Sequence, residues 1–219
     1  MNSSSSAARA VISGSATSWR RINEVVDLVG IFEPGVQVCS WPRSMDPAIA
    51  TYLDGVGHTG TLQRLETLAP GDRAKLDMLP SGEAGENREG HQRLVDDLAL
   101  LTEILCDLID CPAVGLRVTR VDRAMCPKWH VDRVPMRMLC TYDGPGTEWL
   151  EDQGVAHVEL SAPAVADGAR QQAIAGEVVL LKGTLWQNNN SKGAIHRSPT
   201  IAPGCGPRTL VSLDPLWFD

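Results

Sequence analysis

The sequence has no long apolar run, and this absence argues against a membrane-spanning protein. Nowhere in the 219 residues do eighteen apolar residues follow one another, whereas a membrane-spanning helix needs about 20. The first eighteen residues are rich in serine and alanine but lack the continuous apolar segment of a secretory signal. We therefore expect residues 1–18 to form a disordered tail. We also expect a cytoplasmic protein without a membrane partner.

Basic clusters are missing as well. Lysine and arginine together number 20, against 27 aspartates and glutamates, and the formal net charge is −7. A protein that binds nucleic acid through its phosphates concentrates positive charge on one surface. Nucleic acid is therefore not an expected partner, and the sequence leaves the oligomeric state open.

No Cys-x-x-Cys pair occurs among the six cysteines, which are Cys39, Cys106, Cys111, Cys126, Cys140 and Cys205. Disulfide frameworks belong to small secreted domains, so we expect reduced thiols. Cys126 lies four residues before His130 and invites a structural zinc site. Pro127 opposes the helix that this spacing would need, and the tight Cys/His grouping of structural zinc sites is missing.

The first half of the chain, residues 19–112, is predicted to be mainly helical and to pack on a larger core. Apolar residues recur at helical spacing over Trp19–Gly30. Asp46 followed by Pro47 predicts a helix start, with the helix continuing to about Leu53. The strongest helix signal is a leucine stripe over Leu94–Ile109. Only Val36–Trp41 alternates like a strand.

After Pro112 the pattern changes to short strands separated by glycine and proline turns. The predicted strands are Ala113–Val121, Trp129–Tyr142, Ala156–Ser161, Ile174–Leu181, Ala194–Arg197 and Thr209–Asp214. Such a succession is typical of a barrel or sandwich. The fold class is therefore predicted as α+β, with a β core in residues 113–219 and the leucine-striped helix on its outer face.

The candidate site residues lie in this second half. Positions i and i+2 of a strand face the same side, so His130 and Asp132 can direct one imidazole and one carboxylate at a common point. A later histidine, His196, can complete a set of two histidines and one carboxylate. Such a set holds Fe(II) on one side and leaves the remaining positions open. A buried core histidine beside a surface aspartate is the simpler alternative for the His-x-Asp pair alone.

His-x-Asp, a later histidine and then an arginine, Arg208, stand in the order of the Fe(II)/2-oxoglutarate-dependent oxygenase superfamily. The apolar run Gly176–Gly183 before the second histidine also resembles that superfamily. The resemblance covers roughly the C-terminal half. It implies a double-stranded β-helix, cupin-like in form, with His130, Asp132 and His196 as the metal ligands and catalytic centre. Arg208 would bind the distal carboxylate of 2-oxoglutarate, and the substrate is unknown.

A second resemblance covers nearly the whole chain. Cys126–Pro135, Gly144–Trp149 and His196–Pro199 are similar to the bacterial family DUF1826, which has no established activity and is often encoded beside genes of zinc homeostasis. This similarity keeps two alternatives open. The same three ligands could hold Zn(II) in a non-catalytic metal-binding protein, or serve a cupin-type enzyme that needs no keto acid. An inward-facing Arg208 favours the oxygenase.

Overall fold

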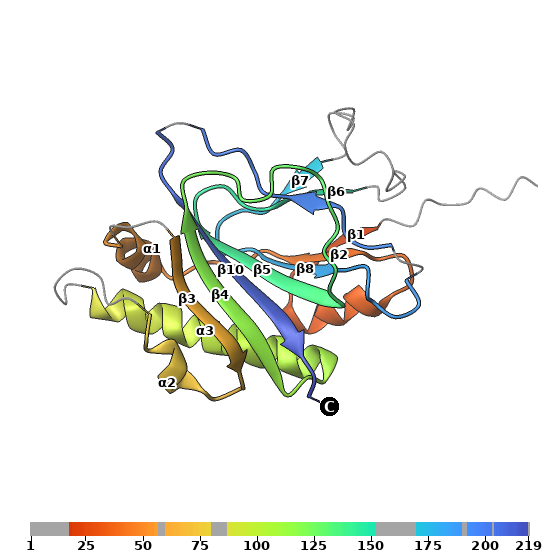
Figure 1. Ribbon diagram of the computed structural model, residues 1–219, viewed down its shortest axis with the longest axis horizontal. Coiled ribbons are helices and arrows are strands. Elements are labelled where there is room, and N and C mark those ends of the chain that lie inside the picture. The colour runs from red at the N-terminus through yellow and green to blue at the C-terminus, as the bar shows by residue number, and fades with distance from the viewer. Residues whose placement is uncertain are drawn as a thin grey trace, which may run out of the picture.

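The computed structural model describes residues 18–56, 60–79, 87–151, 170–189, 192–202 and 204–218. Its centre is a seven-stranded sheet of order β1-β2-β8-β5-β10-β4-β3, faced by a three-stranded sheet of order β7-β6-β9 (Figure 1). In sheet order, the large sheet contains β1 Trp19–Arg21, β2 Val38–Trp41, β8 Val178–Lys182, β5 Met136–Asp143, β10 Arg208–Leu216, β4 Ala113–Val121 and β3 Gly60–Leu68. The small sheet contains β7 Arg170–Gln172, β6 Glu148–Leu150 and β9 His196–Arg197. Strands β1 and β2 pair in parallel, whereas the other pairs are antiparallel.

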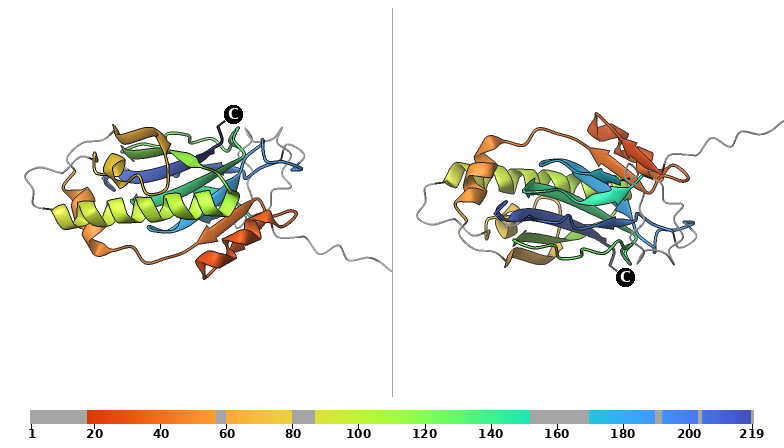
Figure 2. Two further views of the ribbon diagram at one scale, coloured as in Figure 1. Left: turned by 90° about the horizontal axis from the view of Figure 1, so that it is seen from below. Right: turned by 90° about the horizontal axis from the view of Figure 1, so that it is seen from above.

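Helix α3 (Arg88–Ile109) crosses one face of the large sheet (Figure 2). The shorter helices are α1 (Pro47–Asp54) and α2 (Arg73–Leu76), which contact α3, and the 3-10 helix η1 (Val25–Phe32). None of the helices in the described ranges is long and apolar enough to cross a membrane.

Strand alternation divides the interior into two cores. On β5, Met136, Met138 and Cys140 face α3 and join its leucines in the main core. Leu139 faces the opposite way and packs with Trp149 of β6 in a smaller core between the two sheets. Both faces of the large sheet are therefore buried, each against a different layer. One carries the helical layer, and the other supports the small sheet.

Several local predictions are confirmed. The leucine-striped helix forms, although it begins earlier, at Arg88, and it ends at Ile109, followed by Asp110 in a left-handed conformation with φ 51°. Helix α1 begins as predicted, because the Asp46 side chain accepts a hydrogen bond from the Ala48 N–H and Pro47 occupies the first turn. Strand β4 has the predicted limits, Ala113–Val121.

Residues 19–112 contain the helices η1, α1, α2 and α3, and they also supply three strands of the large sheet, β1, β2 and β3. The β core is thus not confined to residues 113–219. Trp19–Gly30 is not one amphipathic helix but a strand followed by a 3-10 turn. With about three residues per turn, Leu28 and Ile31 are buried, whereas Val26 and Val29 are exposed.

Two other expectations cannot be compared with the structure. The predicted tail lies outside the described residues except for Ser18, and so does the predicted strand Ala156–Ser161. Strand β7 had not been predicted, and neither had β3. All six cysteines are free thiols in the structure.

Candidate metal centre

The two histidines of the candidate site are brought together by backbone pairing. His196 lies on β9, opposite Trp149 of β6. His130 lies outside the named strands but forms an isolated bridge with His196. The His130 N–H donates to the His196 carbonyl at 3.0 Å, and the His196 N–H donates to the His130 carbonyl at 2.9 Å. This reciprocal pair places the imidazole centroids 4.4 Å apart.

Asp132 completes the cluster. Its Oδ1 lies 3.7 Å from Nε2 of His130, and its Oδ2 lies 3.3 Å from Nε2 of His196. One ligand atom from each of the three residues lies within 4.8 Å of the others. The side chains are 32%, 16% and 6% exposed for His130, Asp132 and His196 respectively. The cluster is therefore anchored in the protein at His196 and accessible from the side of His130.

Backbone carbonyls orient both imidazoles. Nδ1 of His130 lies 2.9 Å from the Lys128 carbonyl, and Nδ1 of His196 lies 2.9 Å from the Ala194 carbonyl. Since a carbonyl oxygen only accepts, each Nδ1 carries a proton, and in the neutral ring Nε2 presents its lone pair to the shared point. Burial lowers the pKa of His130, and the nearby His196 lowers it further. The neutral, metal-binding form of His130 is therefore favoured.

The carboxylate of Asp132 is held by an arginine that the sequence reasoning missed. Nη1 of Arg137 donates to Oδ2 of Asp132 at 2.7 Å. Its Nε and Nη2 donate to the two carboxylate oxygens of Asp214 at 2.6 and 2.8 Å. Burial raises the pKa of Asp132, but the hydrogen bond and charge of His196 in its protonated form, together with the charge of Arg137, outweigh it and lower the pKa to about 2. Asp132 is thus ionised and fixed in orientation. A charge inside the apolar run Met136–Cys140 is the signal that could have revealed Arg137.

A loop after β8 supports the backbone of Asp132. The Thr184 N–H donates to the Asp132 carbonyl at 2.9 Å, and the Gly183 N–H donates to the Pro135 carbonyl at 2.9 Å. A Cβ at Gly183 would lie 2.0 Å from the Val134 carbonyl oxygen. Glycine is required here because two backbone segments meet too closely for a side chain.

Arg208 is the first residue of β10 and only 1% exposed. Its Nη2 donates to the hydroxyls of Thr147 at 2.7 Å and Thr141 at 3.3 Å. Nε of Arg208 has no hydrogen-bond partner, and no carboxylate of the described residues lies within 4.0 Å of the guanidinium. Burial lowers the pKa of Arg208 to about 10.

The surroundings of Arg208 connect it to the metal ligands. On β10, Arg208 alternates with Thr209 and shares a face with Leu210, which packs with Trp149 between the two sheets. Thr147 lies two positions before Trp149, and Trp149 is the strand partner of His196. Two residues of strand span roughly 7 Å. The guanidinium therefore lies on the same side of the large sheet as the candidate metal ligands.

The nearby aromatic residues and Cys126, the cysteine considered for a structural zinc site, lie outside the cluster. Tyr142 and Trp149 are buried core residues, and Trp129 stacks against Arg197, with the guanidinium carbon 4.3 Å from the ring centroid. Cys126 is exposed. Within the part of the chain that the structure describes, the cluster that could hold a metal ion consists of His130, Asp132 and His196, without a cysteine. Two neutral imidazoles and one ionised carboxylate fit a divalent transition metal.

The fold is mixed α+β with a large sheet and is similar to that of a solved dioxygenase. Dioxygenase for auxin oxidation 1 from Arabidopsis thaliana, solved as a binary complex with 2-oxoglutarate, matches 92% of this chain and 92% of its own with a TM-score of 0.52 and 10% identity. The dioxygenase for auxin oxidation from rice matches 88% of this chain and 77% of its own, with 16% identity and a TM-score of 0.46. AviO1 from Streptomyces viridochromogenes matches 88% of this chain and 96% of its own, with 13% identity and a TM-score of 0.46.

The chain belongs to the family DUF1826, described as a protein of unknown function, whose sequence profile matches residues 23–214. No curated protein matches it significantly.

Proposed function

We propose that this protein is an Fe(II)/2-oxoglutarate-dependent oxygenase that acts on a substrate of unknown identity. In this proposal His130, Asp132 and His196 bind the metal, and Arg208 binds the cosubstrate. The observation that carries it is the buried guanidinium of Arg208, which contacts two threonine hydroxyls but no carboxylate of the described residues. An unpaired buried charge costs on the order of several kcal/mol, so an anionic ligand is the expected partner of this guanidinium.

The residues divide the work of binding. The two histidines and Asp132 occupy one side of the metal and leave positions for exchangeable ligands. Fe(II) and 2-oxoglutarate, when bound, supply the O₂-dependent oxidation of this class of enzyme. Arg208 offers a planar fork of donors that matches a carboxylate in two parallel hydrogen bonds. Arg137 keeps Asp132 ionised and aimed at the metal, since its other donors are fixed on Asp214.

Two alternatives use the same three ligands without needing Arg208. A zinc-binding protein is chemically reasonable, because Zn(II) usually binds such a donor set more tightly than Fe(II) does. A cupin-type enzyme that needs no keto acid is the other. Neither gives a reason for a buried, carboxylate-free guanidinium on the metal side of the sheet, and the oxygenase does. Location in the cytoplasm remains a prediction.

The test is an anaerobic titration of the protein with Fe(II) and then with 2-oxoglutarate. We expect the weak visible charge-transfer band of a chelated keto acid, with about one equivalent of each component bound. His196→Ala should lose the band together with the metal, whereas Cys126→Ala, which changes an exposed thiol outside the cluster, should keep both. A wild-type protein that binds metal but gives neither a band nor heat with 2-oxoglutarate would make the metal-binding alternative the leading account.

A further inference from the structure

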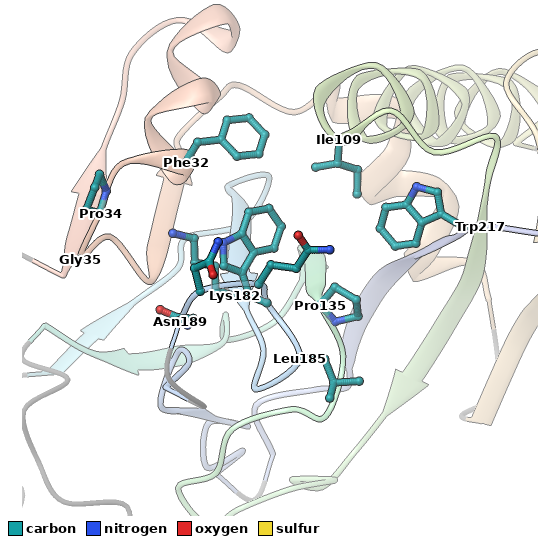
Figure 3. A pocket seen from close by; sticks show the side chains of 12 residues that line it. Phe32, Pro34, Gly35, Ile109, Pro135, Lys182, Leu185, Asn189 and Trp217 are labelled. Carbon is teal, nitrogen blue, oxygen red and sulfur yellow. The ribbon is translucent and has the colours of Figure 1, made fainter.

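A pocket of about 820 Å³ lies at the end of α3, and none of the three candidate metal ligands lines it (Figure 3). Its wall combines Phe32 of η1, Lys182 at the end of β8, Leu185 and Trp186 of the following loop, and Trp217 after β10. Counting Ile109 of α3 and Pro135 before β5, five separate segments of the chain therefore converge on one cavity. Its volume is in the range of small-molecule sites, roughly 300–1,000 Å³.

This pocket lies on the opposite face of the large sheet from the candidate metal centre. On β8, Leu181 packs with Trp149 in the core between the two sheets. Lys182 is the next residue, so its side chain points to the other face, where Trp186 packs against the core of α3. The pocket is thus a second site, separate from the space into which Arg208 and the metal ligands face.

The wall of the pocket is aromatic and partly open to solvent. The chain has only two phenylalanines, two tyrosines and six tryptophans, and three of these residues line this pocket. The rings of Phe32 and Trp186 lie 5.8 Å apart with an angle of 31° between their planes. Phe32, Leu185 and Trp217 are 43%, 52% and 48% exposed. Apolar side chains gathered around a cavity and exposed to water are typical of a binding surface.

Lys182 adds an unpaired positive charge to this aromatic wall. The residue is 4% exposed, and its Nζ lies 3.4 Å from the Glu33 carbonyl and 5.4 Å from the Trp186 ring centroid. Among the described residues, no carboxylate lies within 4.0 Å of Nζ, and the side chain of the neighbouring Glu33 is paired with Arg20. Burial lowers the pKa of Lys182, as expected of an ammonium without a counter-charge.

We infer that this pocket binds a small aromatic carboxylate, with its ring against Trp186, Phe32 and Trp217 and its carboxylate at Nζ of Lys182. A neutral aromatic molecule would leave the ammonium without a counter-charge. A cationic molecule, which an aromatic wall alone could accept, would be repelled by Lys182. The ligand therefore needs both an aromatic ring and a negative charge, because the pocket offers aromatic side chains to the first and Lys182 to the second.

The probe is 2-naphthoate, titrated into the metal-loaded protein by calorimetry and followed by tryptophan fluorescence. Its neutral counterpart, 2-naphthalenemethanol, has the same ring without the charge. We expect naphthoate to bind about tenfold more tightly or better, as a charge-assisted hydrogen bond provides. Lys182→Met should remove this preference. Lys75→Met removes a charge from an exposed lysine paired with Asp72 and should leave the preference intact.

Two further variants separate this site from the metal centre and from misfolding. Trp217→Ala changes a half-exposed residue next to the C-terminus and should weaken both probes while the protein keeps its melting temperature. His196→Ala should leave naphthoate binding unchanged, so the pocket can be confirmed even if the oxygenase proposal fails. Equal binding of the two probes, competition by 2-oxoglutarate, or no binding at millimolar naphthoate would overturn the inference.

Discussion

Replacing Arg208 by methionine should stabilise the ligand-free protein and at the same time weaken 2-oxoglutarate binding. The two effects have one cause. The guanidinium is 1% exposed and lacks a carboxylate partner among the described residues, so the folded protein pays a desolvation cost that only a bound anion can offset. Methionine keeps much of the apolar stem without the charge.

The magnitude follows from the pKa of Arg208, which burial lowers from the ordinary value of an arginine to about 10. Each pKa unit corresponds to 1.36 kcal/mol, so charge burial costs the folded state roughly 3 kcal/mol at neutral pH. Because the unfolded chain binds the proton more readily, this cost is present in full below pH 10 and disappears as the pH rises toward the ordinary pKa of arginine. The two hydrogen bonds to threonine contribute about 1 kcal/mol each. The net gain on substitution is therefore about 1 kcal/mol, or about 2–4 °C in melting temperature.

The effect on the cosubstrate has the opposite sign. Loss of a hydrogen-bonded charge should weaken 2-oxoglutarate binding by about 1.5–3 kcal/mol, or roughly 10- to 150-fold. At a cosubstrate concentration of about 100 times the wild-type dissociation constant, the wild type gains about 2.7 kcal/mol. The variant should gain at most about half of this. Thermal unfolding of the Fe(II)-loaded protein under anaerobic conditions, with and without 2-oxoglutarate, measures both quantities.

A matched control is available in Arg120, another buried arginine of the large sheet. Its guanidinium is paired with Asp143 at 3.1 Å and bonded to the Thr209 hydroxyl at 2.9 Å. Arg120→Met should therefore destabilise the protein, by about 1–3 kcal/mol, and leave the response to 2-oxoglutarate unchanged. Should Arg208→Met melt several degrees below the wild type and still show the full cosubstrate shift, Arg208 would be a structural residue and the reasoning would fail.

Three further predictions concern the metal ligands and their support. Alanine at His130, Asp132 or His196 should abolish stoichiometric metal binding in elemental analysis, and full retention of metal in His196→Ala would rule out the proposed ligand set. Arg137→Met should weaken metal binding by about 10- to 100-fold, as is usual when the residue that orients a ligand is lost. Arg137→Lys should recover part of the loss, and equal affinity in wild type and Arg137→Met by competition with a chelator would refute the role. Finally, burial and His196 lower the pKa of His130 below 6.5, so in the metal-free protein its NMR titration midpoint should lie below 6.5, and a midpoint above that value would contradict the described environment.

Local signals predicted the elements whose burial follows a regular period. Helix α3 buries Leu94, Leu98, Leu101 and Leu105 on one stripe, and these are the residues whose spacing predicts it. Strand β3 was missed because its apolar residues, Leu62, Leu65 and Leu68, are spaced by three as in a helix. The strand pairs with β4 through two register shifts, one between Thr61 and Gln63 and another between Leu65 and Leu68. Each register shift changes which face of the sheet the following side chains point to. Leucines that do not alternate in the sequence can therefore still be buried.

The three candidate ligands could be predicted from the sequence, but the contacts that assemble and support them could not. His130, Asp132 and His196 could be proposed because the chain has only five histidines and because the order of the three residues resembles a known ligand pattern. Their assembly depends on the bridge between His130 and His196, a contact between residues far apart in the sequence that no local period encodes. Arg137 lies five residues after Asp132, beyond a proline. Its contact with Asp132 follows from the turn of the chain into β5 rather than from a shared strand face.

Buried charge separates the functional candidates from the structural ones. Among the described residues, the arginines, lysines, histidines and acidic residues that the structure buries are Arg120, Glu148, Glu177, Lys182, His196 and Arg208. Four of them have a partner of opposite charge type within 4.0 Å: Arg120 pairs with Asp143, Glu148 with Arg197, Glu177 with Arg21, and His196 with Asp132. A paired charge can be kept for the fold alone, because its removal would strand its partner. Arg208 and Lys182 are cations without such a partner among the described residues, and they point to opposite faces of one sheet. An anion bound at each of these two cations would supply the opposite charge that the other four residues already have beside them. We therefore assign the two residues to two separate anionic ligands.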